Sequence, residues 1–62
     1  MADWKDWLLF VLEIIKIIII KLPKMGYAAA RSLAFDTVAD KHGLDVGELE
    51  ARCGAKVDNY FN

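Results

Sequence analysis

The feature that most constrains this chain is a long apolar run near its N-terminus, WLLFVLEIIKIIIIKL over residues 7–22. Between Trp4 and Leu22, 14 of the 19 residues are large and apolar, and no Gly or Pro interrupts them. The run is too long for a typical strand and lacks period-two alternation, so it predicts a helix that ends at Pro23. A surface helix carries an apolar stripe of roughly 100°, but here apolar residues cover most of the circumference. Such a helix must be buried on nearly every side.

One face of this helix has coiled-coil spacing. Its apolar residues follow one another in alternating steps of four and three: Trp4, Leu8, Val11, Ile15, Ile18, Leu22 and Met25. This seam predicts packing against a partner helix, and isoleucine at several of its positions favours bundles larger than dimers. Together with Trp7, the residues from Trp4 to Leu22 on this face form the predicted membrane or oligomer interface.

A bilayer is the first environment that suits the helix. Residues 7–22 reach roughly 24 Å at about 1.5 Å per residue, against a hydrocarbon core of about 30 Å, which predicts a short single span. Trp4 and Trp7 then lie in an aromatic belt. Because Lys21, Lys24 and Arg31 follow the run, the positive-inside rule places residues 25–62 in the cytoplasm.

Two charges stand near the middle of the run, Glu13 and Lys16. Each costs roughly 2.5–3.5 kcal/mol at the centre of a membrane helix, and together they about cancel the gain from the aliphatic residues. Their i,i+3 spacing predicts a pair on one face, which either sets the register of an oligomer or serves as a relay element within a membrane. A water-soluble oligomer with the Trp4–Met25 seam as its core is therefore the second environment.

Residues 22–26 contain the chain's breaker cluster, with Pro23 and Gly26, and predict a hinge. The hinge divides the chain into a hydrophobic helix at residues 1–24 and a small helical hairpin at residues 25–62. An alanine-rich helix is expected over residues 27–42, with Phe35, Val38 and Ala39 on its apolar face. Gly43 follows as its C-terminal cap.

The strongest local pattern begins at Leu44. Asp45 with Glu48 three residues later predicts a capping box, and Leu44 with Leu49 predicts a hydrophobic staple. A short third helix is expected over residues 46–53, burying Val46, Leu49 and Cys53 and ending at Gly54. The remaining residues, AKVDNYFN, are expected to form a largely polar tail.

Residues 35–54 resemble a helix-turn-helix unit, with Ala39 and Gly43 four apart and Val38, Leu44 and Leu49 at core positions. The resemblance implies a DNA-binding regulator whose second helix enters the major groove. That segment carries Asp45, Glu48 and Glu50 against Arg52. Acidic residues at this place oppose binding to a polyanion.

No pattern in the sequence indicates catalysis. One His and one Cys, eleven residues apart, do not supply a set of metal ligands, and Ser32 has no base beside it. We therefore expect an all-α protein without enzymatic activity, metal or cofactor. The sequence favours a membrane-associated structural or accessory interaction subunit, with the first helix as lipid anchor and residues 25–62 as the recognition part. The alternatives are a self-assembling helical oligomer or filament, with or without activity on membranes, whose core is the Trp4–Met25 seam, and a helix-turn-helix DNA-binding regulator.

Overall fold

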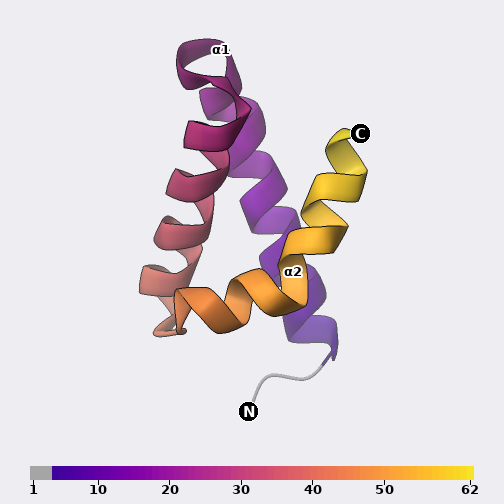
Figure 1. The fold of residues 1–62 in the computed structure, drawn as a ribbon. Coiled ribbons are helices and arrows are strands. Elements are labelled where there is room, and N and C mark those ends of the chain that lie inside the picture. Colours follow the sequence, from indigo (N-terminus) through magenta and orange to yellow (C-terminus); the bar gives the residue numbers. More distant parts are fainter. Residues whose placement is uncertain (1–3) are drawn as a thin grey trace.

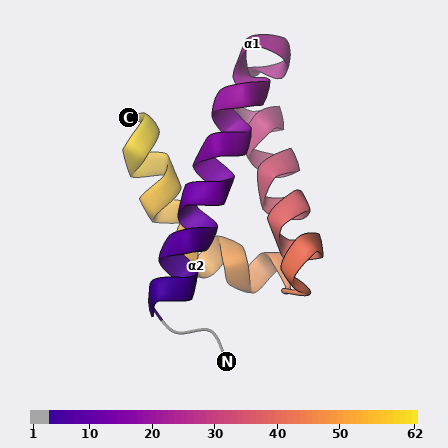
Figure 2. The same cartoon turned by 180° about the vertical axis from the view of Figure 1, so that it is seen from behind.

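The computed structural model describes residues 4–62 and contains two helices, α1 (Trp4–His42) and α2 (Val46–Phe61). All described residues have helical backbone except Gly26 within α1 and Gly43, Leu44, Asp45 and Asn62 outside the helices. The prediction of an all-α fold is confirmed for this part of the chain. Figures 1 and 2 show α1 folded back on itself and α2 packed across its two halves.

The reversal within α1 occurs at Gly26, whose φ of 70° and ψ of 166° are not helical. We call residues 4–25 the first arm of α1 and residues 27–42 its second arm. The sequence predicted that the first helix ends at Pro23, but Pro23 lies inside α1. Proline removes one backbone donor, whereas the sharp change of direction needs a positive φ, which glycine adopts without steric penalty.

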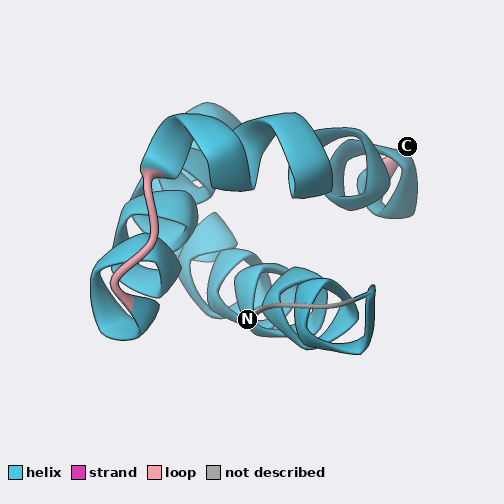
Figure 3. Cartoon of the chain, turned by 90° about the horizontal axis from the view of Figure 1, so that it is seen from below, coloured by secondary structure: helices cyan, strands magenta, loops and turns pink. Residues whose placement is uncertain are grey.

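A three-residue connection, pink in Figure 3, joins the second arm to α2. Gly43 has a φ of 67°, the Leu44 N–H donates to the Ala39 carbonyl at 2.8 Å, and the Gly43 N–H donates to the Asp40 carbonyl at 3.4 Å. These two bonds form a Schellman motif, which satisfies carbonyls at the helix end. Asp45 then caps α2, its side chain accepting from the Glu48 N–H at 3.0 Å.

The sequence predicted that the third helix ends at Gly54, but α2 continues to Phe61. The predicted polar tail is therefore the second half of this helix. Leu49, Cys53 and Val57 are four residues apart and all fully buried, so packing against α1 holds the helix together through the glycine. Val46, predicted to be buried, is 42% exposed.

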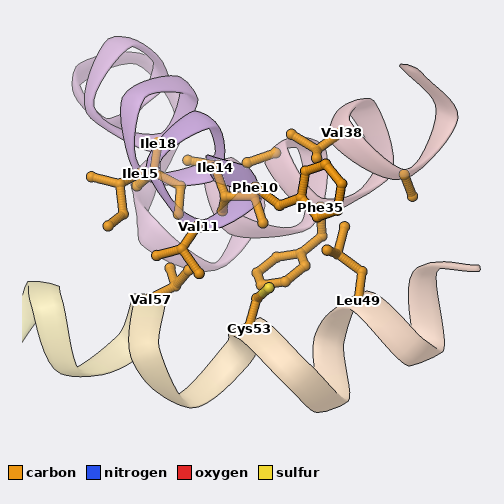
Figure 4. Packing of buried hydrophobic residues seen from close by; sticks show 13 residues of the cluster. Phe10, Val11, Ile14, Ile15, Ile18, Phe35, Val38, Leu49, Cys53 and Val57 are labelled. Carbon is orange, nitrogen blue, oxygen red and sulfur yellow. The ribbon is translucent and has the colours of Figure 1, made fainter. Parts of the chain in front are cut away.

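A single apolar core joins the three helical segments (Figure 4). From the first arm it takes Phe10, Val11, Ile14, Ile15 and Ile18. The second arm and α2 contribute Ala30, Ala34, Phe35, Val38, Ala39, Leu49, Cys53 and Val57. Residues on both sides of the predicted boundary at residue 24 thus share one core.

Within residues 4–62, no helix combines the length and the apolarity needed to cross a membrane. The single span predicted at residues 7–22 is corrected accordingly, because Glu13, Lys16 and Lys21 interrupt the apolar run.

Candidate functional site

The side of the first arm that faces away from the core carries the five most exposed large aliphatic side chains of the described residues. Five aliphatic side chains there are 47–57% exposed: Leu8, Leu9, Leu12, Ile19 and Ile20. Lys5 and Lys16 are exposed among them on the helical wheel. We call these seven residues the outer face. Monomeric soluble proteins rarely expose contiguous apolar patches of this kind without a function.

The charges of the outer face all have one sign. At 100° per residue, no acidic side chain of the described first arm falls between Leu8 and Ile20 on the wheel. The nearest acid beyond that sector, Glu13, accepts from Lys41 Nζ at 3.0 Å and lies 3.0 Å from His42 Nε2. The outer face is therefore apolar and cationic, although the whole chain has a net charge of −1.

Glu13 does not form the predicted i,i+3 pair with Lys16. It links the first arm to the end of the second arm instead, and the His42 ring also lies tilted against the Phe10 ring with centroids 4.6 Å apart. The hydrogen bond from Lys41, aided by that with His42, lowers the pKa of the Glu13 carboxyl. The sequence missed this contact because its partners lie 28 and 29 residues away.

The predicted seam is divided by the fold. Val11, Ile15 and Ile18 are buried within the chain, whereas Leu8, Leu22 and Met25 are 37–47% exposed. Trp7 is half-buried, packing edge-on against Phe10, with the Arg52 guanidinium 5.0 Å from its ring centroid. The middle of the seam therefore packs against the chain's own α2 and second arm, while Leu8, Leu22 and Met25 towards its ends stay exposed.

A polar network that the sequence did not predict joins the second arm to α2. Arg31 Nε donates to Asp58 Oδ1 at 2.7 Å, Arg31 Nη1 donates to Glu50 Oε2 at 2.8 Å, and Nη2 contacts both carboxylates. The Tyr27 hydroxyl donates to Asp58 Oδ1 at 2.6 Å. Hydrogen bonds from Arg31 and then Tyr27 lower the pKa of Asp58, and those to Glu50 and Asp58 raise that of Arg31.

Gly54 makes room for this network. A Cβ built on Gly54 would lie 2.7 Å from Glu50 Oε1 and 3.0 Å from Arg31 Nη2. Glu50, Gly54 and Asp58 follow one another at steps of four on α2. That acid–glycine–acid spacing is the one signal by which the network is visible in the sequence, since it places two carboxylates on one helix face with a gap between them.

The remaining predicted site residues lie at the α2 N-terminus. Glu48 pairs with Arg52 across one helical turn at 3.4 Å, and no bond from it to the Asp45 N–H is present among the described residues. Leu44 packs partly buried against the core that contains Leu49. These residues fix the turn and the start of α2, and their contacts are with this chain.

Comparison of the chain with family models, curated proteins and solved structures finds no match. The geometry alone then bears on function. No three His, Cys, Asp or Glu side chains within the described residues could together hold a metal ion. Cys53 is fully buried, with its Sγ 3.8 Å from the Trp7 carbonyl oxygen, and burial raises the pKa of its thiol. This cysteine is a packed core residue rather than an activated nucleophile.

Proposed function

We propose that this chain is a small non-enzymatic protein that associates with the surface of an anionic membrane through the outer face. Residues 27–62 then form the part that interacts with other proteins. The observation that carries the proposal is an exposed, aliphatic and exclusively cationic face on one long helical arm.

The apolar component supplies binding energy. Fully burying an aliphatic side chain gains roughly 1.5–3 kcal/mol, and about half of each of the five side chains is still exposed to water. Their insertion at the boundary between headgroups and acyl chains then gains roughly 5 kcal/mol before the entropy lost on binding is subtracted. A helix of this kind lies in the plane of the interface and does not need to span the bilayer.

The charge distribution orients the molecule. Lysines near an anionic surface contribute about 1 kcal/mol each, and Lys5 and Lys16 lie within the outer face. Six acidic residues lie in residues 25–62, on segments that pack against the opposite side of the arm. Binding by the outer face therefore brings these two lysines to the headgroups and keeps most acids away from them. Because cytoplasmic leaflets carry anionic lipid, we place the protein on the cytoplasmic side.

Cosedimentation with vesicles tests the proposal. The full chain is expected to pellet with vesicles of mixed phosphatidylcholine and phosphatidylserine, and much less with phosphatidylcholine alone. Leu12→Glu and Ile20→Glu should each reduce binding at least tenfold, since both replace exposed aliphatic groups by acids. Lys16→Glu should weaken binding chiefly at low salt, where electrostatic attraction is least screened.

Val46→Glu is the matched control, because Val46 is an exposed aliphatic residue away from the outer face. It is expected to bind as the unchanged chain does. If the unchanged chain stays in the supernatant with anionic vesicles at low salt, the proposal is wrong. Self-association in solution that Leu12→Glu abolishes would instead identify a second copy of the chain as the occupant of the outer face.

A further inference from the structure

The three helical segments are not tied to one another equally. Arg31 and Tyr27 join the second arm to α2 through charged and neutral hydrogen bonds to Glu50 and Asp58. Over residues 7–25, the polar contacts of the first arm with the rest of the described chain are those of Glu13 and of the Trp7 carbonyl oxygen with the Cys53 thiol. The second arm and α2 therefore form a polar-linked pair. Residues 7–25 of the first arm pack against this pair mainly through apolar side chains, with the Arg52 guanidinium of α2 beside the Trp7 ring.

The two sides of the core also differ in size. The first arm contributes five large side chains, Phe10, Val11, Ile14, Ile15 and Ile18. The pair contributes eight residues, of which Ala30, Ala34, Ala39 and Cys53 are small. If the first arm separated from the pair, its large side chains would move with it, and many of the core side chains that stay on the pair would be small.

Gly26 is the point about which the arm can turn. Its φ of 70° and ψ of 166° lie in a region that is essentially restricted to glycine. Apart from its chain neighbours and the backbone of its own helix, no atom lies within 4 Å of the position of a Cβ. No side chain from elsewhere therefore packs on Gly26, and glycine reaches other φ and ψ values more easily than any other residue.

We infer that the core-facing side of the first arm is a second lipid-binding surface, which reaches the bilayer when the arm separates from the pair by turning about Gly26. This inference rests on the proposed function. The Phe10, Val11 and Ile14 side chains and their neighbours then exchange protein contacts for acyl chains, so their burial is retained. An arm that is apolar around most of its circumference gains most by lying within the interface rather than on it.

Cys53 reports the separation directly. It is the only cysteine of the chain, it is fully buried, and its Sγ lies 3.8 Å from the Trp7 carbonyl oxygen of the first arm. A water-soluble maleimide should label Cys53 slowly in the free protein and at least tenfold faster after addition of phosphatidylserine-containing vesicles. The helix content measured by circular dichroism should not fall during this change.

A substitution at Glu13 tests the inference, because the Glu13 carboxylate links the first arm to the second arm. Glu13→Gln removes the charge that holds Lys41 and His42, so labelling of Cys53 should become several-fold faster both with and without vesicles. Glu48→Gln is the matched control, because it removes an equal charge from an exposed pair within α2 and should leave the labelling rate unchanged.

Sedimentation of the same samples separates the two proposals. If the protein pellets with vesicles but Cys53 stays protected, the outer face binds lipid and separation of the arm is wrong. If the protein does not pellet, both proposals are overturned. Faster labelling of Cys53 with loss of helix content would indicate unfolding. A labelling rate that depends on protein concentration in the absence of vesicles would indicate exchange of first arms between copies of the chain. Either result overturns the inference.

Discussion

At the scale of residues, Arg31 joins α2 to the second arm through contacts with two acidic side chains and an aromatic ring. Its guanidinium contacts two carboxylates of α2 and also lies 4.7 Å from the ring centroid of Phe35. The Arg31 side chain is 20% exposed, while Glu50 and Asp58 are 45% and 44% exposed. Solvent therefore screens part of the attraction, and the energy of the network is smaller than that of buried ion pairs.

Arg31→Ala is expected to lower the free energy of unfolding by about 1–2 kcal/mol, because it leaves the Glu50 and Asp58 carboxylates without this partner. Urea denaturation followed by circular dichroism measures the change. Lys56→Ala also removes one positive charge, from an exposed position on α2, and should change stability by less than about 0.5 kcal/mol. Equal effects of the two substitutions would show that the network contributes nothing beyond net charge.

At the scale of elements, two glycines with positive φ decide where helices end. Gly43 sits in a Schellman motif, a position that asparagine also occupies in other proteins. Gly26 combines its positive φ with a ψ of 166°, outside the left-handed helical region that asparagine tolerates. The two glycines therefore differ in what can replace them, although neither has an atom within 4 Å of a Cβ position.

Gly26→Asn is expected to cost about 1–3 kcal/mol of stability, because the backbone there strains any side chain. Gly43→Asn should cost less than about 1 kcal/mol, since asparagine is the commonest substitute at such a cap. Thermal and urea unfolding of both variants gives the comparison. A Gly26→Asn protein as stable as Gly43→Asn would mean that the reversal tolerates a different backbone geometry.

At the scale of the whole molecule, two carboxylates hold the packing of the three segments. Glu13 links the two arms of α1, and Asp58 links the second arm to α2. Contacts with cations lower both pKa values, at Glu13 first through Lys41 and at Asp58 first through Arg31. A carboxyl whose pKa is lowered by folding stabilises the folded state above its unfolded pKa, and that contribution is lost as pH falls through the folded pKa.

The protein is therefore expected to keep this stability above about pH 5 and to lose it as the pH falls below about 4, where unfolded Asp and Glu titrate. Urea denaturation at a series of pH values measures the loss. Asp58→Asn should flatten the dependence, because one of the two lowered carboxyls is absent. An unchanged acid slope in that variant would assign the dependence to Glu13 or to other groups.

The sequence by itself determined the local features. Helix periodicity predicted the all-α class and helix at residues 4–22, 27–42 and 46–53, because apolar spacing and alanine content act within a few turns. These residues are helical, but the helix continues past residue 22 to residue 25 and α2 continues past residue 53 to Phe61. The Asp45 cap and the Gly43 turn were visible for the same reason, since their hydrogen bonds span three to five residues. An excess of apolar surface on the first arm was also visible, because it follows from composition around the helix.

Only the tertiary structure decided which partner each side chain meets. Glu13 faces Lys41 and His42 instead of Lys16. Val11, Ile15 and Ile18 are buried in the chain's own core, whereas Leu8, Leu22 and Met25 of the same seam stay exposed. α2 runs past Gly54 because Leu49, Cys53 and Val57 bury one continuous face and the glycine leaves space for Arg31. These outcomes depend on contacts between residues far apart in the chain, which periodicity and propensity do not contain. The same packing leaves the aliphatic and lysine residues of the outer face exposed to solvent, because the second arm and α2 cover only one side of the first arm.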